Sequence, residues 1–276
     1  MAVLQDTDND VLILDAYNLI YRARYSARWQ KDTGHTITYN FFRSLRKLIE
    51  DLNPSKAYFV LEGSPVARLE AAEDYKGTRE REKDESFSTQ RNEIISIMKH
   101  FMPISVYKHP NYECDDVISY IACKVHPGDN VTVVSTDTDF FQLFDMHKNI
   151  KIYNPIKKEY IEPPDFDYVR WKALRGDSAD NISGFKGVGD KTALKLVNNP
   201  QMLVEFLNKD PEREKKFNHN LFMINFHDVD PNGMEIYESG FQESAVKSVF
   251  EEFNFRSILK EKPWNTFVDT FGGLNE

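Results

Sequence analysis

Short apolar runs alternate with longer amphipathic segments through the first 160 residues of the chain. We predict strands at the runs VLIL (11–14), AYFVL (57–61), ISVY (104–107), VTVVS (131–135) and IKIYN (150–154). Helical periodicity predicts helices between them, at 40–52, 88–101 and 115–125. Strands that alternate with helices are typical of a parallel sheet covered on both faces. We therefore expect an α/β domain at residues 1–160, with a mostly parallel central sheet flanked by helices.

The pattern changes in two places. Residues 74–92 are highly charged and nearly devoid of large apolar side chains, so we expect no core element there. A surface helix or an arch above the sheet fits better, reaching from about residue 74 to about residue 100. From about residue 161 onward, prolines separate helical segments joined by turns. We expect a second, helical region at residues 161–276, without an obvious internal repeat.

Nine carboxylates stand in short clusters, most of them where an apolar run ends. They are Asp15, Glu62, Glu113, Asp115, Asp116, Asp137, Asp139, Asp177 and Asp180. Ligands of parallel sheets bind outside the carboxyl ends of the strands, so the clusters that follow strands should meet at one rim. Close carboxylates repel one another and need a cation, and their hard oxygen atoms select Mg²⁺ or Mn²⁺. The sequence therefore predicts a metal-dependent enzyme and favours one that acts on phosphodiesters.

Each acidic cluster taken alone also has a structural interpretation. Acids such as those in ECDD commonly cap helix N-termini, where free N–H groups favour negative charge. Asp177 and Asp180 also suit an Asx-turn before Gly184. Capping does not require all the clusters at one rim, however, and their joint occurrence favours the metal site.

The segment GFKGVGDKTALKLV at 184–197 is a second signal. Its glycines permit a tight turn with exposed N–H groups, followed by a helix that starts near Asp190. Such a hairpin offers amides and a helix N-terminus to phosphate without reading bases, and Lys191 and Lys195 add positive charge. A plain helix–helix turn is the alternative. The glycine spacing is wrong for a Walker loop, and no strand precedes it.

The composition excludes few of the functions considered above. The net charge is −9, but setting aside the nine clustered carboxylates leaves a neutral remainder, so a nucleic-acid partner is not excluded. No apolar run approaches the ~20 residues that span a bilayer, and the N-terminus lacks the features of a signal peptide. Two cysteines give no disulfide framework, which fits a reducing cytoplasm. We expect a cytoplasmic protein without a membrane partner.

The ordered motifs LDAYNLIYR, DYKGTR, YECDDVISYIA, STDTDFFQL and GDSADNISGFKGVGDKTA resemble those of the 5′-nuclease family. Its members include bacteriophage 5′–3′ exonucleases, flap endonucleases and the 5′-nuclease domain of bacterial DNA polymerases. The resemblance runs from about Val11 to Leu196. It implies a PIN-like α/β nuclease domain with a helical arch, and a helix-three-turn-helix that grips duplex DNA, with its hairpin at 184–192.

The resemblance also implies roles for individual residues. All nine clustered carboxylates match metal-site acids, some of them acting through water, and Lys76 and Arg79 match catalytic basic residues of the arch. The expected DNA-binding residues are Arg22, Tyr75, Lys76, Arg79, Gly184, Gly187, Gly189, Lys191 and Thr192. Two or more Mg²⁺ ions are implied, with Mn²⁺ as a substitute and a K⁺ ion at the 184–189 hairpin. The family usually has Asp where this chain has Glu62, so either the sheet retreats slightly or Glu62 binds through water.

The implied activity is metal-dependent 5′–3′ exonuclease and 5′-flap endonuclease cleavage of DNA by a two-metal mechanism, in replication and repair. The partners would be DNA with a 5′ flap or 5′ end, RNA·DNA hybrids and replication proteins. We expect a monomeric, stand-alone nuclease in a bacterial cytoplasm or a phage-infected cell, since no polymerase segment follows. The alternatives are a ribonuclease of PIN or RNase H type that removes primers from hybrids, and a non-catalytic DNA-junction binding module.

Overall fold

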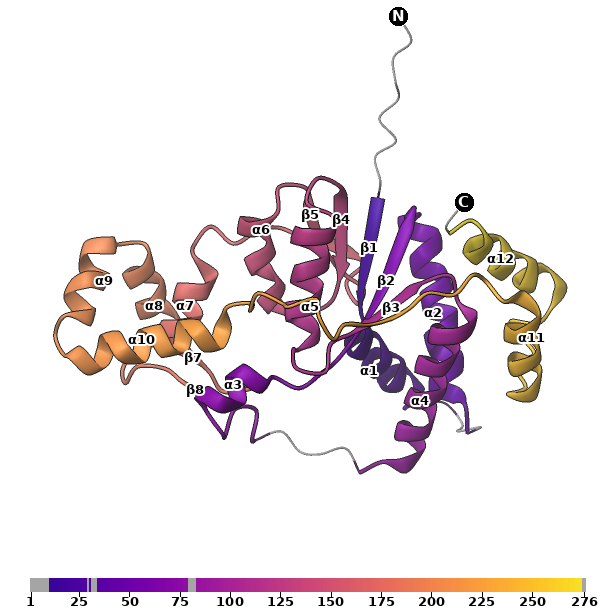
Figure 1. The fold of residues 1–276 in the computed structure, drawn as a ribbon, viewed down its shortest axis with the longest axis horizontal. Coiled ribbons are helices and arrows are strands. Elements are labelled where there is room, and N and C mark those ends of the chain that lie inside the picture. Colours follow the sequence, from indigo (N-terminus) through magenta and orange to yellow (C-terminus); the bar gives the residue numbers. More distant parts are fainter. Residues whose placement is uncertain (1–9, 29, 31–33, 79–82, 275–276) are drawn as a thin grey trace, which may run out of the picture.

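A mostly parallel sheet forms the centre of the computed structural model, which describes residues 10–28, 30, 34–78 and 83–274. The strand order is β6-β5-β4-β1-β2-β3-β9, with β1 to β5 parallel and the two edge strands antiparallel (Figure 1). The strands are β1 (Asp10–Asp15), β2 (Lys56–Leu61), β3 (Ser105–Lys108), β4 (Asn130–Val134), β5 (Ile150–Asn154), β6 (Glu159–Ile161) and β9 (Glu235–Tyr237). The prediction of a mostly parallel sheet built on five strands is confirmed.

Helices cover both faces of this sheet. The first face carries α1 (Ala16–Ala27), α2 (Thr36–Leu52), α4 (Glu85–Phe101), α11 (Glu243–Glu252) and α12 (Glu261–Gly272). The second face carries α5 (Cys114–Tyr120), its π-helical continuation (Ile121–Val125), a 3₁₀ turn (Thr138–Gln142) and α6 (Leu143–Met146). No helix among the described residues is long and apolar enough to cross a membrane.

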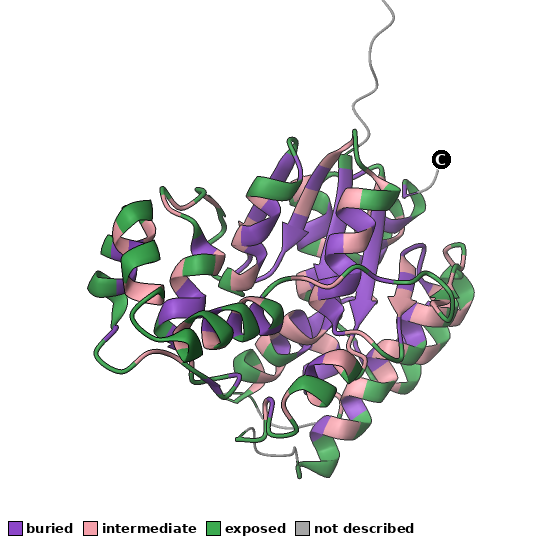
Figure 2. Cartoon of the chain, turned by 60° about the vertical axis from the view of Figure 1, so that its left-hand side comes forward, coloured by how far each residue is buried: buried purple, intermediate pink, exposed green. Residues whose placement is uncertain are grey.

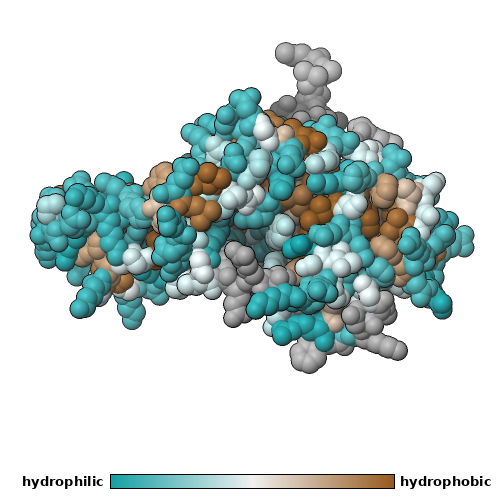
Figure 3. Space-filling view, turned by 60° about the horizontal axis from the view of Figure 1, so that its bottom comes forward, coloured by the Kyte–Doolittle hydropathy of each residue, from teal (hydrophilic) through white to brown (hydrophobic). Residues whose placement is uncertain are grey.

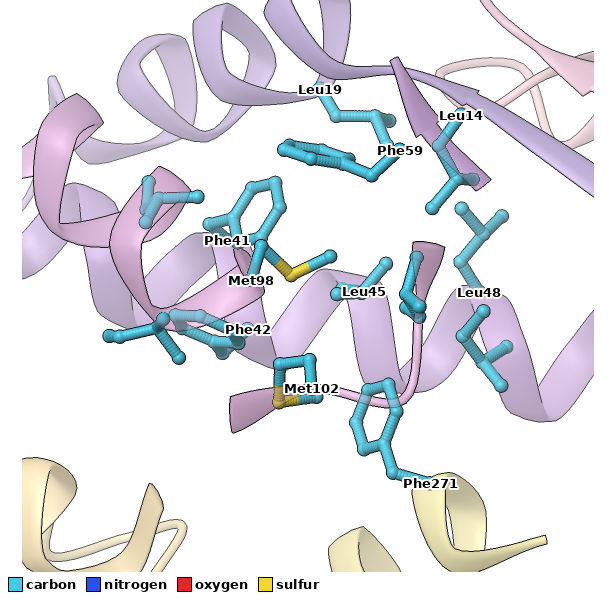
Figure 4. Packing of buried hydrophobic residues seen from close by; sticks show 14 of the residues in the cluster. Leu14, Leu19, Phe41, Phe42, Leu45, Leu48, Phe59, Met98, Met102 and Phe271 are labelled. Atoms are coloured by element: carbon cyan, nitrogen blue, oxygen red, sulfur yellow. The ribbon is translucent and has the colours of Figure 1, made fainter. Parts of the chain in front are cut away.

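Alternation along the central strands separates the two cores. In β1, Leu12 and Leu14 join the first-face core, whereas Val11 and Ile13 join the second. On the first face, Leu14 and Phe59 meet Phe41 of α2, together with Met98, Met102 and Phe271 (Figure 4). Buried strands and exposed outer helix surfaces are plain in Figure 2. The carboxyl ends of these buried strands therefore position the residues that follow β1, β2 and β4.

A helical lobe projects to one side of the sheet, at the left of Figure 1. It has its own apolar core, which α3 also joins. Its elements are α3 (Val66–Ala71), α7 (Tyr168–Arg175), α8 (Asp190–Val197), α9 (Pro200–Leu207), α10 (Pro211–Ile224) and the small sheet of β7 (Gly176–Asp177) and β8 (Ile182–Ser183).

The helical region expected from residue 161 onward is interrupted. Helices α7 to α10 fit the expectation, but β9 pairs with β3 in the central sheet. Helices α11 and α12 then bury Phe250, Phe267 and Phe271 in the first-face core. The apolar sides of these last helices thus complete the α/β domain, so the chain after about residue 225 returns to the first domain.

The segment 74–92 divides differently from the prediction. Residues 75–78 form turns, but α4 already starts at Glu85, with the Asp84 side chain accepting a hydrogen bond from Phe87 N (3.0 Å). Phe87 is fully buried, and buried Gln90 accepts a hydrogen bond from Ile37 N through its Oε1 (2.7 Å). The expectation that no part of 74–92 is a core element is therefore wrong for 85–92. Phe87 and Gln90 therefore both pack this first part of α4 against the domain.

Candidate metal centre and nucleic-acid interface

Four carboxylates gather around the carboxyl ends of β1, β2 and β4, and we call them the first acid group. Asp15 ends β1, Glu62 directly follows β2, Asp137 lies beyond β4, and Asp115 lies in the first turn of α5. Burial, and then the charges of the other three members, raise the pKa of Asp115 well above its usual value. The sequence prediction that separate clusters meet at this rim holds for these four residues.

Asp15 and Glu62 are held by specific hydrogen bonds. Asp15 caps α1 by accepting from Asn18 N (3.0 Å) and also accepts from Ser135 Oγ (2.8 Å). Burial raises its pKa to about 6, against the effect of these hydrogen bonds. Glu62 Oε2 accepts from Cys114 N at the start of α5 (3.1 Å), and burial raises the pKa of Glu62 as well. The longer side chain of Glu62 thus reaches the helix that carries Asp115.

Three further carboxylates form a second acid group, Asp139, Asp177 and Asp180. One oxygen atom from each lies within 4.8 Å of the others, which is close enough for one ion to bind all three. Lys172 of α7 contacts two of them, and its Nζ lies 2.7 Å from Asp177 Oδ2 and also forms an ion pair with Asp139. Burial raises the pKa of Asp139 despite this ion pair. For Asp177, burial is outweighed by the Lys172 contact, which lowers the pKa.

Asp116 departs from the prediction of a metal ligand. Its carboxylate accepts two hydrogen bonds from the guanidinium of Arg68 (2.7 and 2.9 Å) and one from His227 N (2.8 Å). Arg68 also donates to Met223 O and Asn225 O, so this buried pair ties α3 and α5 to the end of α10. Adjacent residues on a helix point about 100° apart, so Asp116 faces the lobe while Asp115 faces the rim.

Glu113 contacts the basic residues Arg68 and Lys76 beside the two acid groups. Its carboxylate forms an ion pair with Arg68 (2.7 Å) and accepts hydrogen bonds from the Tyr75 hydroxyl (3.1 Å) and from Lys76. Tyr75 also donates to Asp180 (3.3 Å) and is buried. Its hydroxyl thus links two acids inside the protein, and the DNA contact expected of Tyr75 stays a prediction.

The predicted basic residues have three different outcomes. Lys76 lies at the acids, bonded to Glu113, and its backbone N–H donates to Asp180 O (3.1 Å) in a left-handed conformation with φ of 54°. Arg79 lies outside the described residues. Arg22 is half-buried in a groove with Arg43, Lys47 and Tyr153, between α1, α2 and the end of β5. Burial in that groove lowers the pKa of Arg22.

The hairpin before α8 combines packing with exposure. A Cβ atom on Gly184 would lie 1.9 Å from Arg175 O, so this glycine is required for close packing against α7. Gly187, with φ of 80°, and Gly189, which precedes the first turn of α8, are exposed in open space. Lys191 and Thr192 are exposed beside them. The N-terminus of α8 is thus accessible to phosphate, whereas the full helix-three-turn-helix stays a prediction.

Three residues of the site were missed by the sequence reasoning, namely Arg68, Ser135 and Lys172. Each offsets or orients a carboxylate at the rim. Nothing in the spacing of Arg68 identified it, since its partners lie more than 40 residues away. Lys172 stands five residues before Asp177, at the end of a helix, and that proximity was a usable signal.

The donor set fits a divalent ion at the rim. The charged side chains that could bind a cation in both groups are carboxylates, and burial raises the pKa of Asp15, Glu62 and Asp115, as expected where carboxylates lack enough positive charge. On the side that carries the carboxyl ends of the strands, hydrophilic residues alternate with apolar patches, and the lobe projects beside it (Figure 3).

Comparison with known families decides the relationship. The model of the 5′–3′ exonuclease N-terminal resolvase-like domain matches residues 10–170. The chain belongs to the 5′–3′ exonuclease family. The resemblance inferred from the motifs is therefore confirmed at the level of the family.

Relatives of the 5′–3′ exonuclease family occur both alone and within polymerases. The chain is 29% identical to a 5′–3′ exonuclease of Mycoplasmopsis pulmonis, over 68% of this chain and 66% of that protein. It is 30% identical to the thermostable DNA polymerase I of Thermus filiformis, over 70% of this chain but 24% of the polymerase. The chain thus spans about a quarter of the polymerase relatives and about two thirds of the exonuclease.

Solved structures support the fold. T5 5′-exonuclease with bound zinc has a TM-score of 0.65 at 19% identity, covering 97% of this chain and 100% of that one. The catalytic core of Rad2 in complex with a DNA substrate has a TM-score of 0.58 at 17% identity, covering 96% and 93%. At such identities the likeness concerns the fold, and it confirms the predicted 5′-nuclease architecture.

Proposed function

We propose that the chain is a Mg²⁺-dependent nuclease that hydrolyses DNA phosphodiesters near a 5′ end, as a 5′–3′ exonuclease and a 5′-flap endonuclease. The observation that carries the proposal is the pair of acid groups at one rim, with Lys76 beside them. Family membership supports the nuclease activity. The preference for flaps is the more specific part, and the match of the DYKGTR motif to the family's arch supports it.

Each acid group would hold one divalent ion. Asp15, Glu62, Asp115 and Asp137 would hold one ion, and Asp139, Asp177 and Asp180 a second. Bound at such sites, two divalent ions lower the pKa of a water molecule and stabilise the leaving oxygen during in-line displacement. Asp15 and Glu62 are oriented by hydrogen bonds from Ser135 and from the N-terminus of α5.

Lys76 would contribute positive charge at the scissile phosphate. Its ammonium group lies at the edge of the acids, tethered to Glu113, and its backbone conformation is fixed by Asp180. A strained left-handed backbone at a non-glycine residue is common at functional sites. We assign Arg79 the same kind of role from the motif alone.

The hairpin before α8 would hold the duplex through its phosphates. Gly187 and Gly189 leave the N-terminus of α8 open, and Lys191 and Thr192 extend the same exposed surface. Lys191→Ala should weaken duplex binding equally for all sequences and flatten the salt dependence by about one unit. Titration of two unrelated duplexes at several salt concentrations tests this, and a loss confined to one sequence would contradict it. A K⁺ ion at 184–189 would show as potassium-specific tightening in the same titration.

Cleavage of a 5′-flap duplex tests the proposed function directly. The flap substrate is labelled at either end and incubated with Mg²⁺ or with EDTA, using the wild type and Asp115→Asn. Release of short 5′ products by the wild type with Mg²⁺ only, and little release by the variant, is the expected result. Binding of the duplex without any Mg²⁺-dependent cleavage would overturn it. An RNA·DNA hybrid in parallel reports whether primers are also substrates.

The proposal also covers the oligomeric state and the cellular location of the protein. We infer a monomer that works in a reducing cytoplasm beside replication proteins. Both cysteines are free, and Cys114 is buried against the acids, where an oxidised sulfur would disturb the site. Light scattering of the purified protein tests the monomer, and a dimer at micromolar concentration would contradict it.

A further inference from the structure

The second acid group already contains a cation from the protein itself. The Lys172 side chain is buried, with 8% of its surface exposed, and its ammonium group bridges Asp139 and Asp177. These are two of the three residues whose oxygen atoms are close enough to hold one ion. The ammonium therefore contacts two of the three carboxylates that a divalent ion would need.

The first acid group is different. Among the described residues, no lysine or arginine forms an ion pair with Asp15, Glu62, Asp115 or Asp137. Lys76 lowers the pKa of Glu62 and Asp115 through space only, while its ammonium is bonded to Glu113. A divalent ion that enters the first acid group thus meets no bonded side-chain cation among the described residues. An ion that enters the second acid group meets the ammonium of Lys172.

We propose that Lys172 is the resident counter-ion of the Asp139–Asp177–Asp180 group and that a divalent ion binds there only by displacing its ammonium. The displacement breaks the contacts of Nζ with Asp139 and Asp177, and the charge of Lys172 moves toward solvent at the edge of the site. This inference rests on the proposed function for the presence of ions. It adds that the ion affinities of the two groups are unequal because of one lysine.

Two consequences follow. The protein keeps the second acid group in shape without metal, since a buried ammonium offsets the repulsion of its carboxylates. The same contacts oppose binding of the second ion, and a charge-assisted hydrogen bond shifts an equilibrium by about ten- to a hundredfold. The wild type should therefore bind one Mn²⁺ ion tightly and a second about ten- to a hundredfold more weakly.

The test counts bound ions rather than product. Mn²⁺ binding to the full chain is followed by electron paramagnetic resonance and calorimetry, and thermal unfolding is followed in EDTA and in Mn²⁺. Lys172→Met is compared with the wild type and with Lys209→Met, which removes the same charge from an exposed position between α9 and α10. Lys172→Met should tighten the weaker site about tenfold or more and lower the unfolding temperature in EDTA. Lys209→Met should do neither.

A second variant guards against misfolding of the first. In Lys172→Met/Asp177→Asn one carboxylate is neutralised along with the lysine, so stability in EDTA should return toward that of the wild type while the weaker ion site is lost. An unchanged affinity of the weaker site in a folded Lys172→Met would overturn the inference and leave the proposed function intact. A wild type that binds no Mn²⁺ at all would instead overturn the proposed function.

Discussion

Removal of the charge at Asp15 should stabilise the metal-free protein. Asp15 is buried at the end of β1, and burial raises the pKa of its carboxyl group from 3.8 to about 6. The folded protein therefore holds this proton more tightly than the unfolded chain does. The stabilisation of the fold by this bound proton is fully present below pH 3.8, decreases as the pH rises to about 6, and is absent above that pH. At neutral pH the buried carboxylate destabilises the fold.

The size of the effect follows from the two pKa values. Their difference is 6 − 3.8 = 2.2, and each unit corresponds to 1.36 kcal/mol, so the charge costs about 3 kcal/mol above pH 7. At pH 5 only about half of this penalty has developed, since the group is still mostly protonated in the folded protein. Asn at this position keeps an oxygen for Asn18 N and can donate to Ser135 Oγ.

Urea unfolding of wild type and Asp15→Asn in EDTA, at pH 5 and pH 7.5, measures the effect. We expect Asp15→Asn to raise the free energy of unfolding by up to ~3 kcal/mol at pH 7.5 and by about half as much at pH 5. Asp177→Asn is the matched control. Lys172 lowers the pKa of Asp177, so removal of the Asp177 charge should destabilise the protein. A stabilisation by Asp15→Asn that does not change with pH would refute the reasoning.

Three further predictions concern single side chains. Arg68→Met should lower the free energy of unfolding by about 3–5 kcal/mol in urea titrations, because Asp116 and Glu113 stay buried without their partner; a loss below 1 kcal/mol would contradict this. Lys76→Ala should slow flap cleavage about 10²–10³-fold in single-turnover assays with unchanged unfolding by circular dichroism; near-normal turnover would remove its catalytic role. Glu62→Asp should cost about 1 kcal/mol of stability in EDTA, since the shorter side chain no longer reaches Cys114 N; equal stability would show that the hydrogen bond is dispensable.

Much of the fold was predictable because its signals are local. A continuous apolar run such as VLIL, which alternates with amphipathic segments, favours a strand buried on both faces, and β1 occupies that position. The rule that ligands meet at the carboxyl ends of parallel strands then placed Asp15, Glu62 and Asp137 at one rim without any long-range information. The position of α11 and α12 was not predictable in this way, because their apolar sides fit a separate helical domain equally well.

The site was less predictable than the fold, because it depends on direction as well as on position. Glu113, Asp115 and Asp116 are near neighbours in sequence, yet one meets Lys76, one the first acid group and one Arg68. Residue type and spacing assigned all three to metal. The direction of each side chain depends on where α5 begins and on its partners in α3. The sequence does not show either of these.

The basic residues at the rim follow from the same electrostatics as the acids. A fold that brings carboxylates together at the end of a sheet is destabilised by them, as the raised pKa values of Asp15 and Asp115 show. Arg68 and Lys172 reduce this cost for Asp116 and Asp139, and these ion pairs also join α3 and α7 to the sheet domain. The first acid group has no such partner among the described residues, so its stability depends most strongly on a bound ion. We therefore expect the unfolding temperature to respond to Mg²⁺ mainly through that group, and Asp115→Asn to remove most of the response.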